Sequence, residues 1–396
     1  MTRLKLSPAH IIAVGPDSRK AGWGPFQFPN LFQTGDGTLV CSFRDCADSE
    51  AAYNDPSRRF FSTDRGEHWT ETAYDAFAAE EGLLLDNGER ILFEPLSSIP
   101  ESDVQLPKPI GSTFLFGSTA YRASDFPKDV LELTWPMQRV LPDGTVLREK
   151  PILNWPYAFV RTRAGVLVRP APRGRLRQGP DGTLWMPHYT AGGVDPENGG
   201  YVPYHCIYLF SSSDRGHSWN LRDFLPYTPD IRRHPLAFYL EGWNENDIGF
   251  APDGTMFRLL RLDGRWPPRH TPMHITWSSD GEHWSEPIPF DDHGVWPCIL
   301  PLACGVTLAS YGRPGVQLRA TEDPSCRKWD APVELVHSDG LASDDPANVL
   351  VRATCAYTEM IALDDRTAGL VYSDFTIRDE AGTPRKTILF RTVTVL

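Results

Sequence analysis

The sequence lacks any long run of apolar residues. No stretch approaches the ~18 to 20 consecutive apolar residues that a membrane-spanning helix requires, so no membrane span is expected. The first twenty residues, MTRLKLSPAHIIAVGPDSRK, contain no apolar segment typical of a secretory signal. A cytoplasmic location is the simplest expectation, although a secreted protein whose signal had been removed would look the same.

Paired cysteines and cofactor motifs are also missing. The seven cysteines are an odd number, the closest two are Cys41 and Cys46, and no C-x-x-C occurs. This pattern favours free thiols over a disulfide framework or a zinc site. The sequence has no H-E-x-x-H, EF-hand, P-loop or G-x-G-x-x-G motif. We therefore expect no metal, no nucleotide and no other cofactor.

Positive charge is scarce. Lysine and arginine number 39 against 51 aspartate and glutamate, which gives a net charge of −12. A general nucleic-acid binder needs a basic surface, so this class is disfavoured. A local basic pocket for an anionic ligand remains compatible with the charge. The short basic run RGRLRQ at 173–178 is either a solvated edge or the lining of an anion pocket.

What the chain has in abundance is turns. The chain contains 36 prolines and 32 glycines, a composition that suits many short strands joined by turns. The motif S-x-D-x-G-x-x-W occurs as STDRGEHW at 62–69 and SSDRGHSW at 212–219, with weaker copies at 278–284 and 321–329. Its Ser and Asp side chains can hydrogen-bond to the backbone of the turn, and its Gly can adopt a positive φ. Its Trp side chain can pack, buried, against a sheet. The repeats predict one β-hairpin turn used several times.

A second repeated turn, D-G-T followed by apolar residues, occurs at 35–40, 142–147, 180–185 and 252–257. Weaker versions occur at 86–92, 304–308 and 365–371. Such turns between apolar alternations predict hairpins, and hairpins that recur every ~40 to 60 residues are typical of propeller blades. We expect about six blades in one domain over residues 1–396, with 95–150 as an insertion or long loops. The last strand, KTILFRTVTVL, is expected to pair with the N-terminal segment LKLSPAHIIAV.

These repeats resemble the Asp-box sialidase (neuraminidase) superfamily. The resemblance implies an all-β fold, a six-bladed β-propeller with Asp-box (BNR-repeat) turns. It also implies an exo-glycoside hydrolase that cleaves a terminal anionic sugar, sialic acid or a related 2-keto sugar, from a small carbohydrate or glycan terminus. Asp-box turns occur in lyases and non-catalytic propellers too, so the turn alone does not decide function.

Two stretches resemble the catalytic strands of that family. In NENDIGFAPDGTMFRLLR, 244–261, Glu245 and Arg261 would lie on adjacent strands across the turn at Asp253; a rim ion pair is the alternative. In ATCAYTEM, 353–360, Tyr357 matches the nucleophile, and a core tyrosine is the alternative. A neutral phenol avoids repulsion by the carboxylate at the anomeric carbon of a sialic acid. Glu245 would be its proton partner.

The arginines that bind the substrate carboxylate in that family are only partly matched. ASYGRPGVQLRA, 309–320, resembles the strand that supplies the last of them, with Arg313 preferred and Arg319 second. PFQFPNLF, 25–32, resembles the opening strand but carries Gln27 where the family has arginine. Glutamine offers a neutral donor instead of a charged fork. Arg44, on the paired strand, is the nearest candidate to compensate.

The acid/base aspartate of the family falls in the loop DCADSEAAYNDPSRRFF, 45–61. Asp48, Glu50 and Asp55 are the candidates; Asp48 is preferred and Asp55 is close behind.

His188 and His205 stand at the ends of strand-like runs and could face the central pocket, where His188 is a further candidate for binding the substrate. The two histidines also support an alternative function. A His base with a Tyr acid can catalyse β-elimination on a uronide, so the chain would then be a polysaccharide lyase. Structural roles for these histidines, and a non-catalytic glycan-binding propeller, are the remaining interpretations.

Overall fold

The computed structural model describes residues 2–21, 24–46, 57–94, 98–113, 117–169, 172–232, 235, 237–264, 271–337 and 353–396. Regular structure in these residues is almost entirely β-strand. The helical elements are short 3-10 turns, η2 (Ala78–Glu80), η3 (Glu101–Asp103), η4 (Ala123–Asp125) and η5 (Ala237–Tyr239). This confirms the predicted all-β class. No helix among the described residues is long and apolar enough to cross a membrane.

The chain divides into two compact units. The first comprises Met1–Glu81, Gly249–Phe257 and Asp291–Leu396, and the second comprises Gly82–Ile248 and Arg258–Phe290. The single domain over residues 1–396 stays a prediction, and the two units are described separately below.

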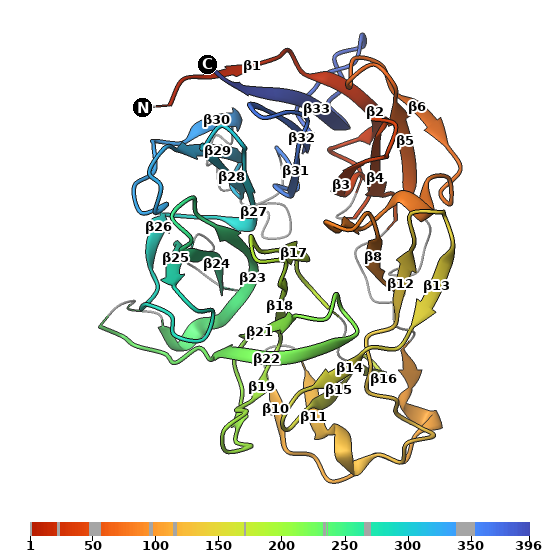
Figure 1. Ribbon diagram of the computed structural model, residues 1–396, viewed down its shortest axis with the longest axis vertical. Coiled ribbons are helices and arrows are strands. Elements are labelled where there is room, and N and C mark those ends of the chain that lie inside the picture. Colours follow the sequence, from red (N-terminus) through yellow and green to blue (C-terminus); the bar gives the residue numbers. More distant parts are fainter. Residues whose placement is uncertain are drawn as a thin grey trace. The chain divides into compact units, whose positions relative to one another are not determined.

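The first unit contains three antiparallel sheets. One sheet has the order β1 (Leu4–Leu6), β33 (Arg385–Val395), β32 (Thr367–Asp374) and β31 (Thr358–Ala362), with β2 (His10–Asp17) also on β33. The second sheet has the order β3 (Gln27–Gln33), β4 (Leu39–Arg44), β5 (Arg58–Ser62) and β6 (Thr70–Thr72). The third has the order β27 (Val295–Pro301), β28 (Thr307–Gly312), β29 (Val316–Thr321) and β30 (Val333–Val336). Figure 1 shows the strands of these sheets in red to orange (β1 to β6), cyan to light blue (β27 to β30) and dark blue (β31 to β33). Strand β31 contacts both β3 and β27, so one edge from each sheet meets its neighbours.

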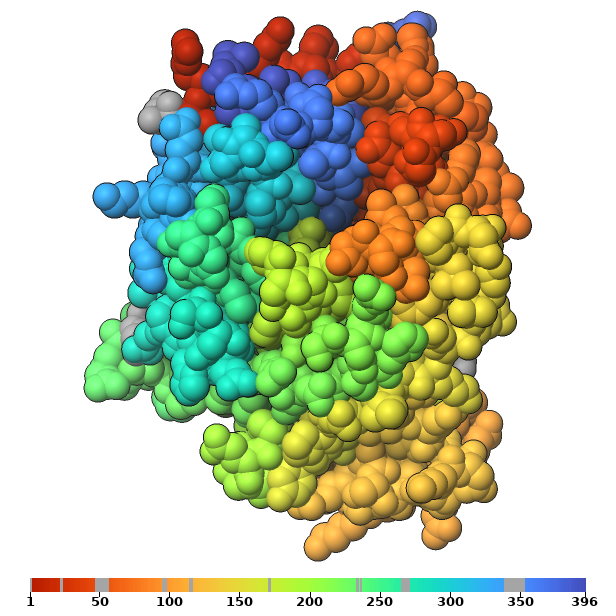
Figure 2. Space-filling model, viewed as in Figure 1, coloured from red at the N-terminus to blue at the C-terminus, as the bar shows by residue number. Residues whose placement is uncertain are grey.

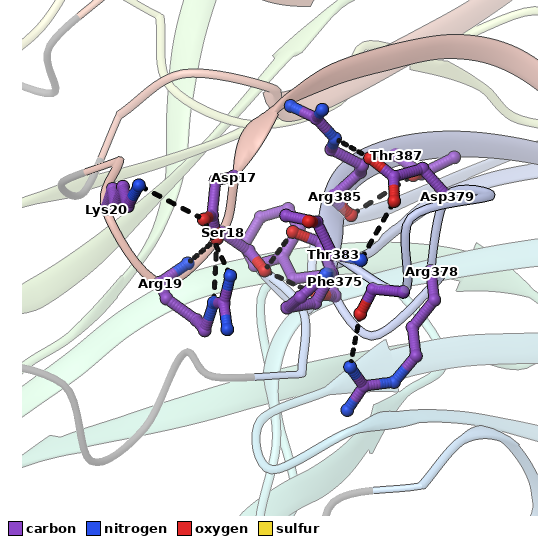
Figure 3. Close-up of polar contacts among 12 residues, drawn as sticks. Asp17, Ser18, Arg19, Lys20, Phe375, Arg378, Asp379, Thr383, Arg385 and Thr387 are labelled. Carbon is purple, nitrogen blue, oxygen red and sulfur yellow. Dashed lines mark hydrogen bonds and ion pairs between the residues drawn. The ribbon is translucent and has the colours of Figure 1, made fainter.

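The two ends of the chain pair as predicted. Leu4 lies opposite Val395 in the β1–β33 ladder, and His10 lies opposite Phe390 in the β2–β33 ladder. The red and blue ends therefore lie side by side in Figure 2. Beyond β2, the Ser18 hydroxyl donates to the carbonyl oxygens of Phe375 at 2.8 Å and Pro384 at 3.1 Å (Figure 3). These bonds fix the N-terminal segment to the C-terminal hairpin.

The second unit is built from further small sheets. One has the order β10 (Gly111–Thr113), β11 (Ser118–Arg122), β15 (Phe159–Arg163), β16 (Val166–Val168) and β9 (Ile99–Pro100). Another has the order β13 (Val146–Glu149), β12 (Met137–Val140), β8 (Arg90–Phe93) and β7 (Leu83–Leu84). A third is β14 (Ile152–Asn154), β22 (Ser218–Leu225), β21 (Cys206–Ser212), β18 (Leu184–Thr190), β17 (Arg177–Gln178), and a small one is β19 (Gly193–Val194) with β20 (Tyr201–Val202). Segment 95–150 thus holds short strands as well as loops.

A last sheet has the order β23 (Leu240–Phe250), β24 (Met256–Gly264), β25 (Met273–Ser278) and β26 (Ile288–Asp291). Every residue of β23 except Phe250 is buried. A strand buried on both faces is usually apolar, yet β23 reads LEGWNENDIGF. Polar residues in such a strand need partners or a function.

Each unit has its own hydrophobic core. In the second unit Trp135, Trp219, Tyr208 and Phe210 are among the fully buried side chains of one large cluster. In the first unit one cluster contains Phe26, Phe43 and Phe390, and another contains mainly aliphatic side chains of β28, β29, β32 and β33.

The S-x-D-x-G-x-x-W turns repeat two hydrogen bonds, of which the copy at 212–219 makes only the first. There the Gly216 N–H donates to the Ser212 hydroxyl at 2.8 Å, and the Trp219 indole nitrogen has no partner among the described residues. In the turn at 62–69, the Gly66 N–H donates to the Ser62 hydroxyl at 2.9 Å and the Trp69 indole donates to the Gly66 carbonyl at 3.0 Å. The shortened copy at 278–284 repeats both bonds, at 2.9 and 3.0 Å. The copy at 321–329 lacks the glycine, but its Trp329 indole still donates to a backbone carbonyl, that of Cys326, at 2.8 Å.

The D-G-T turns are also alike. In each, the threonine N–H donates to the aspartate carboxylate, at 3.0 Å for Asp36, 2.9 Å for Asp143, 3.0 Å for Asp181 and 2.8 Å for Asp253. The glycine in each has φ between 82° and 89°, a conformation that glycine adopts without steric cost.

Candidate functional site

Two aromatic side chains in the first unit pack against Tyr357 and form a cluster of three rings with it. Trp296 stacks on it with 5.1 Å between ring centroids, and Phe28 meets it edge-on at 4.7 Å. Tyr357 immediately precedes β31, whereas Phe28 lies in β3 and Trp296 in β27. All three side chains are half-buried. The cluster, called the aromatic cluster below, therefore offers partly exposed rings, which are suited to packing against a sugar face.

Irregular backbone positions these rings. The β3–β4 ladder shifts register between Gln27 and Asn30, and the β27–β28 ladder shifts between Val295 and Cys298. Phe28 and Trp296 thus lie in bulges, which re-aim side chains and are frequent beside active sites.

The backbone is strained at the same place. Phe28 has φ 55°, Trp296 φ 45°, Arg313 φ 63° and Ala356 φ 67°. Left-handed φ at a residue other than glycine costs on the order of 1–3 kcal/mol, and it is a genuine outlier for bulky residues. Four such residues around Tyr357 mark this cluster as a functional-site candidate.

Two arginines flank the aromatic cluster. The Arg313 guanidinium carbon lies 5.9 Å from the Tyr357 ring centroid, and its Nη2 donates to the Cys355 carbonyl at 3.2 Å. The Arg44 guanidinium carbon lies 5.6 Å from the Phe28 centroid. Positive charge next to a phenol attracts an anionic group and favours a developing phenolate.

Arg319, the second choice at this end, is engaged elsewhere. Its Nη2 is ion-paired with Asp291 at 2.8 Å, and its Nε donates to the Tyr311 hydroxyl at 2.8 Å. Tyr311 in turn donates to Asp291. Burial and the Asp291 carboxylate raise the pKa of Tyr311 well above its usual value. Arg319 therefore belongs to a structural triad, and Arg313 is the arginine beside Tyr357.

Gln27 lies opposite Arg44 in the β3–β4 ladder, as predicted. Its side chain is fully buried, and neither its amide nitrogen nor its amide oxygen has a hydrogen-bond partner among the described residues. An unsatisfied buried amide costs about 1–3 kcal/mol. In this structure Gln27 is thus a buried neighbour of the site, and its binding of substrate stays a prediction.

A network of charged and polar groups occupies β23 and β24 in the second unit. The Glu245 carboxylate is ion-paired with Arg261 Nη1 at 2.8 Å, and Arg261 Nη2 is bonded to Asp263 at 2.8 Å. The Glu245 and Arg261 side chains are only 5% and 14% exposed. The two residues lie on adjacent strands, as predicted, and the buried position of their ion pair distinguishes it from a solvated rim ion pair.

The network continues to His205. Asn244 Nδ2 donates to Asp263 at 2.6 Å and lies 3.1 Å from His205 Nδ1. Burial lowers the pKa of His205 to about 3, against an opposing effect of Asp263, so its imidazole is neutral at pH 7. Ligand atoms of His205, Glu241 and Asp263 all lie within 4.8 Å of one another, which is close enough for one metal ion to contact all three.

His188 lies in β18 of the same unit and is 3% exposed. Burial, followed by the charges of Arg173 and Arg161, lowers the pKa of His188 to about 3. It lines a small cavity together with those two arginines. His188 and His205 are both buried and neutral, which was not evident from their places at the ends of strand-like runs.

The remaining predicted residues cannot be placed in one site. Asp48, Glu50 and Asp55 lie outside the described residues. Tyr357 and Arg313 belong to the first unit, and Glu245 and Arg261 belong to the second. Their cooperation therefore stays a prediction.

No protein-family model and no curated protein matches this sequence. Among solved structures, a Dyadobacter fermentans protein of unknown function is similar with a TM-score of 0.61 and 17% identity over 99% of both chains. An α-L-arabinofuranosidase from Fusarium graminearum, in complex with an iminosugar inhibitor, is similar with a TM-score of 0.50 and 12% identity over 98% of both chains. A mutant of NanB sialidase from Streptococcus pneumoniae gives 0.51 and 12%, over 98% of this chain and 71% of that one.

At these identities the likeness shows the fold alone. The fold is sialidase-like and of the propeller class, and two of these neighbours are glycoside hydrolases. The predicted resemblance is thus supported as a resemblance of fold.

Several residues of both sites were missed from the sequence. Trp296 and Phe28 gave no signal, because a bulge cannot be recognised in GVWPC or PFQFP alone. Asp263 had one: it lies two residues after Arg261 on the same strand, and residues i and i+2 of a strand share a face.

Proposed function

We propose that this protein is a glycoside hydrolase built as a six-bladed propeller with Asp-box turns. Its substrate would be a terminal anionic sugar, sialic acid or a related 2-keto sugar, on a small carbohydrate or glycan end. The aromatic cluster is the observation that carries the proposal, since strained backbone and two bulges hold Tyr357 between two rings and beside Arg313. The fold shared with two glycosidases supports it.

The proposed mechanism retains the anomeric configuration. The Tyr357 oxygen forms a bond to the anomeric carbon while its proton passes to the Glu245 carboxylate. Asp48 or Asp55 gives a proton to the leaving oxygen as the glycosidic bond breaks. Water then displaces the phenol from the same carbon, and the protons return along the same routes.

The arginines have the second role in this proposal. Arg261 and Arg313 bind the anionic substituent, and Arg44 supplies the charge that Gln27 lacks. Arg261 already holds Glu245 and Asp263, so it would also fix the position of the carboxylate that accepts the proton.

The lyase alternative is weaker on the same geometry. A general base works best when its pKa is near the operating pH, whereas burial lowers the pKa of both His188 and His205 to about 3. A lyase would also need a tyrosine acid, and the Tyr208 ring stacks on that of His188. The Tyr208 hydroxyl, however, already donates to the Val194 carbonyl at 2.8 Å.

A panel of fluorogenic aryl glycosides tests the proposal. Wild type should release the fluorophore from an aryl sialoside or a related 2-keto sugar, Tyr357→Phe should abolish release, and Glu245→Gln should lower kcat about 10²- to 10⁴-fold. Tyr74→Phe, at an exposed tyrosine of the first unit, is the matched control and should retain activity.

Other outcomes reject parts of the proposal. Release only from an aryl α-L-arabinofuranoside would keep the hydrolase and reject the anionic sugar. Absorbance from an unsaturated uronide would indicate a lyase, and binding on a glycan array without turnover would indicate a binding protein. Near wild-type activity of Tyr357→Phe would reject the mechanism.

A further inference from the structure

A small basic cavity lies in the second unit between residues of β15, β16 and β18. Three arginines line it, Arg161, Arg169 and Arg173, together with His188 and Trp155. None of its described lining residues is acidic. In a chain with a net charge of −12, three cations converging on one cavity need an explanation.

His188 supplies the first part of one. The ring is held edge-on by Trp155, with 5.8 Å between centroids, and its Nδ1 is buried without a hydrogen-bond partner among the described residues. Buried polar atoms in native proteins are nearly always bonded. A neutral imidazole offers one N–H donor, so a bound acceptor would satisfy this group.

The arginines supply the second part. Arg161 is buried in β15, and its Nη1 donates to the Ala191 carbonyl at 3.1 Å, which anchors the guanidinium. Arg173 makes no hydrogen bond or ion pair within the described part of the chain. Its neighbours in the run RGRLRQ differ, since Arg177 and Arg175 approach Asp247 at 2.5 and 3.9 Å. Of that run, Arg173 alone lines the cavity.

We infer that this cavity binds one oxyanion group, a carboxylate, sulfate or phosphate. Guanidinium groups bind such groups through paired N–H donors, and His188 would add a further donor. The cavity volume of about 20 Å³ holds little more than one water-sized group. Only an anionic head group can therefore enter, either as a small free ion or as the substituent of a sugar that stays outside.

This site goes beyond the proposed function, because its three arginines take no part in that mechanism. Its test likewise does not require glycosidase activity. Loss of oxyanion binding would leave hydrolysis through Tyr357 untouched, and the reverse also holds.

Equilibrium dialysis with radiolabelled sulfate measures the site directly. Wild type should bind one sulfate per chain that depends on Arg173, and acetate, phosphate and glucuronate should compete for it. Glucuronate displacing sulfate at least tenfold better than acetate would identify a sugar-borne carboxylate, and stronger binding of sulfate and phosphate would identify a free ion. Both results support the site.

Variants connect the binding to the cavity. Arg173→Gln should weaken sulfate binding at least tenfold, and Arg173→Lys should weaken it less because the charge is kept. Arg148→Gln removes an equally charged but exposed side chain of the same unit and should change nothing. Circular dichroism confirms that each variant is folded, and Arg169→Gln replaces Arg173→Gln if that variant is not. The absence of saturable binding, or equal binding by the cavity variants and wild type, would overturn the inference.

Discussion

Gln27 is the residue at which this chain departs from the sialidase pattern. The structure places it opposite Arg44, as predicted, but buries its amide without partners in the described residues. A glutamine in this state cannot replace a charged, solvent-facing arginine. Anion binding at the aromatic cluster would therefore depend on Arg44 and Arg313.

A stability measurement tests the burial of Gln27. Replacing an unsatisfied buried amide with an apolar group of similar shape is neutral or stabilising, so Gln27→Met should leave the free energy of unfolding unchanged or raise it by about 1 kcal/mol. Gln33→Met is the control, because Gln33 Nε2 donates to the Gly37 carbonyl at 3.1 Å, and its loss should be mildly destabilising. Urea denaturation measures both. A loss of more than about 2 kcal/mol for Gln27→Met would mean that the amide has an essential partner.

The buried histidines predict a pH dependence of stability. Burial lowers the pKa of His188 and His205 to about 3, whereas an unfolded histidine titrates near ~6.5. Between these values the unfolded chain binds more protons than the folded one. The free energy of unfolding should thus be full above pH ~6.5 and should fall by up to about 1.4 kcal/mol per pH unit per histidine as the pH drops towards 3.

Urea denaturation between pH 7.5 and 5 measures this slope. His188→Gln should reduce the slope by about one proton, while His217→Gln, at an exposed histidine of the same unit, should leave it unchanged. A wild-type stability that does not change over this range would contradict the buried, neutral state of both rings.

At the scale of elements, the repeated turns were the most predictable feature. Their geometry is set by a few consecutive residues: an aspartate that accepts backbone N–H bonds and a glycine at positive φ. The bulges at Phe28 and Trp296 were not predictable, because they depend on how β31 packs against β3 and β27 rather than on local preference. The placement of Glu245 and Arg261 on adjacent strands was predictable, because one turn joins these strands.

Two glycines separate turn conformation from packing. Gly66 has φ +92°, and an added Cβ would lie 2.1 Å from the Phe390 ring, whereas Gly305 has φ +88° and open space around the added atom. Alanine at either position costs about 1–2 kcal/mol for the left-handed backbone. Gly66→Ala should cost roughly 1–3 kcal/mol more because the ring must move. Equal losses in urea denaturation would show that the Gly66 turn is not packed on Phe390.

At the scale of the whole molecule, the described cysteines are all free, as expected from their number and spacing. Cys41, Cys206, Cys298, Cys326 and Cys355 are buried, and only Cys46 and Cys304 are partly accessible. Burial raises the pKa of the Cys41 and Cys206 thiols, which slows their reaction further. A thiol-specific chromogenic reagent should count seven thiols in guanidinium and at most two rapidly reacting ones in the native protein. Fewer than seven after denaturation without reductant would indicate a disulfide.

The whole fold was predictable as a class, since periodic hairpins leave few alternatives. The number of blades could not be predicted firmly, and neither could the meeting of Tyr357 with Glu245 in one site. Both depend on contacts between segments far apart in the sequence. The acid/base residue was narrowed only to Asp48, Glu50 and Asp55, since a loop offers no periodicity to choose among them.

The central claim is that Tyr357 is the nucleophile of a retaining glycosidase. The most direct measurement is mass spectrometry after incubation with an activated fluorinated sialosyl donor, which forms a glycosyl-enzyme intermediate faster than water releases it. The account predicts one added sugar per chain, located by peptide mapping on Tyr357 and absent from Tyr357→Phe. A sugar attached to another residue, or turnover of the aryl sialoside with no adduct on Tyr357, would contradict it.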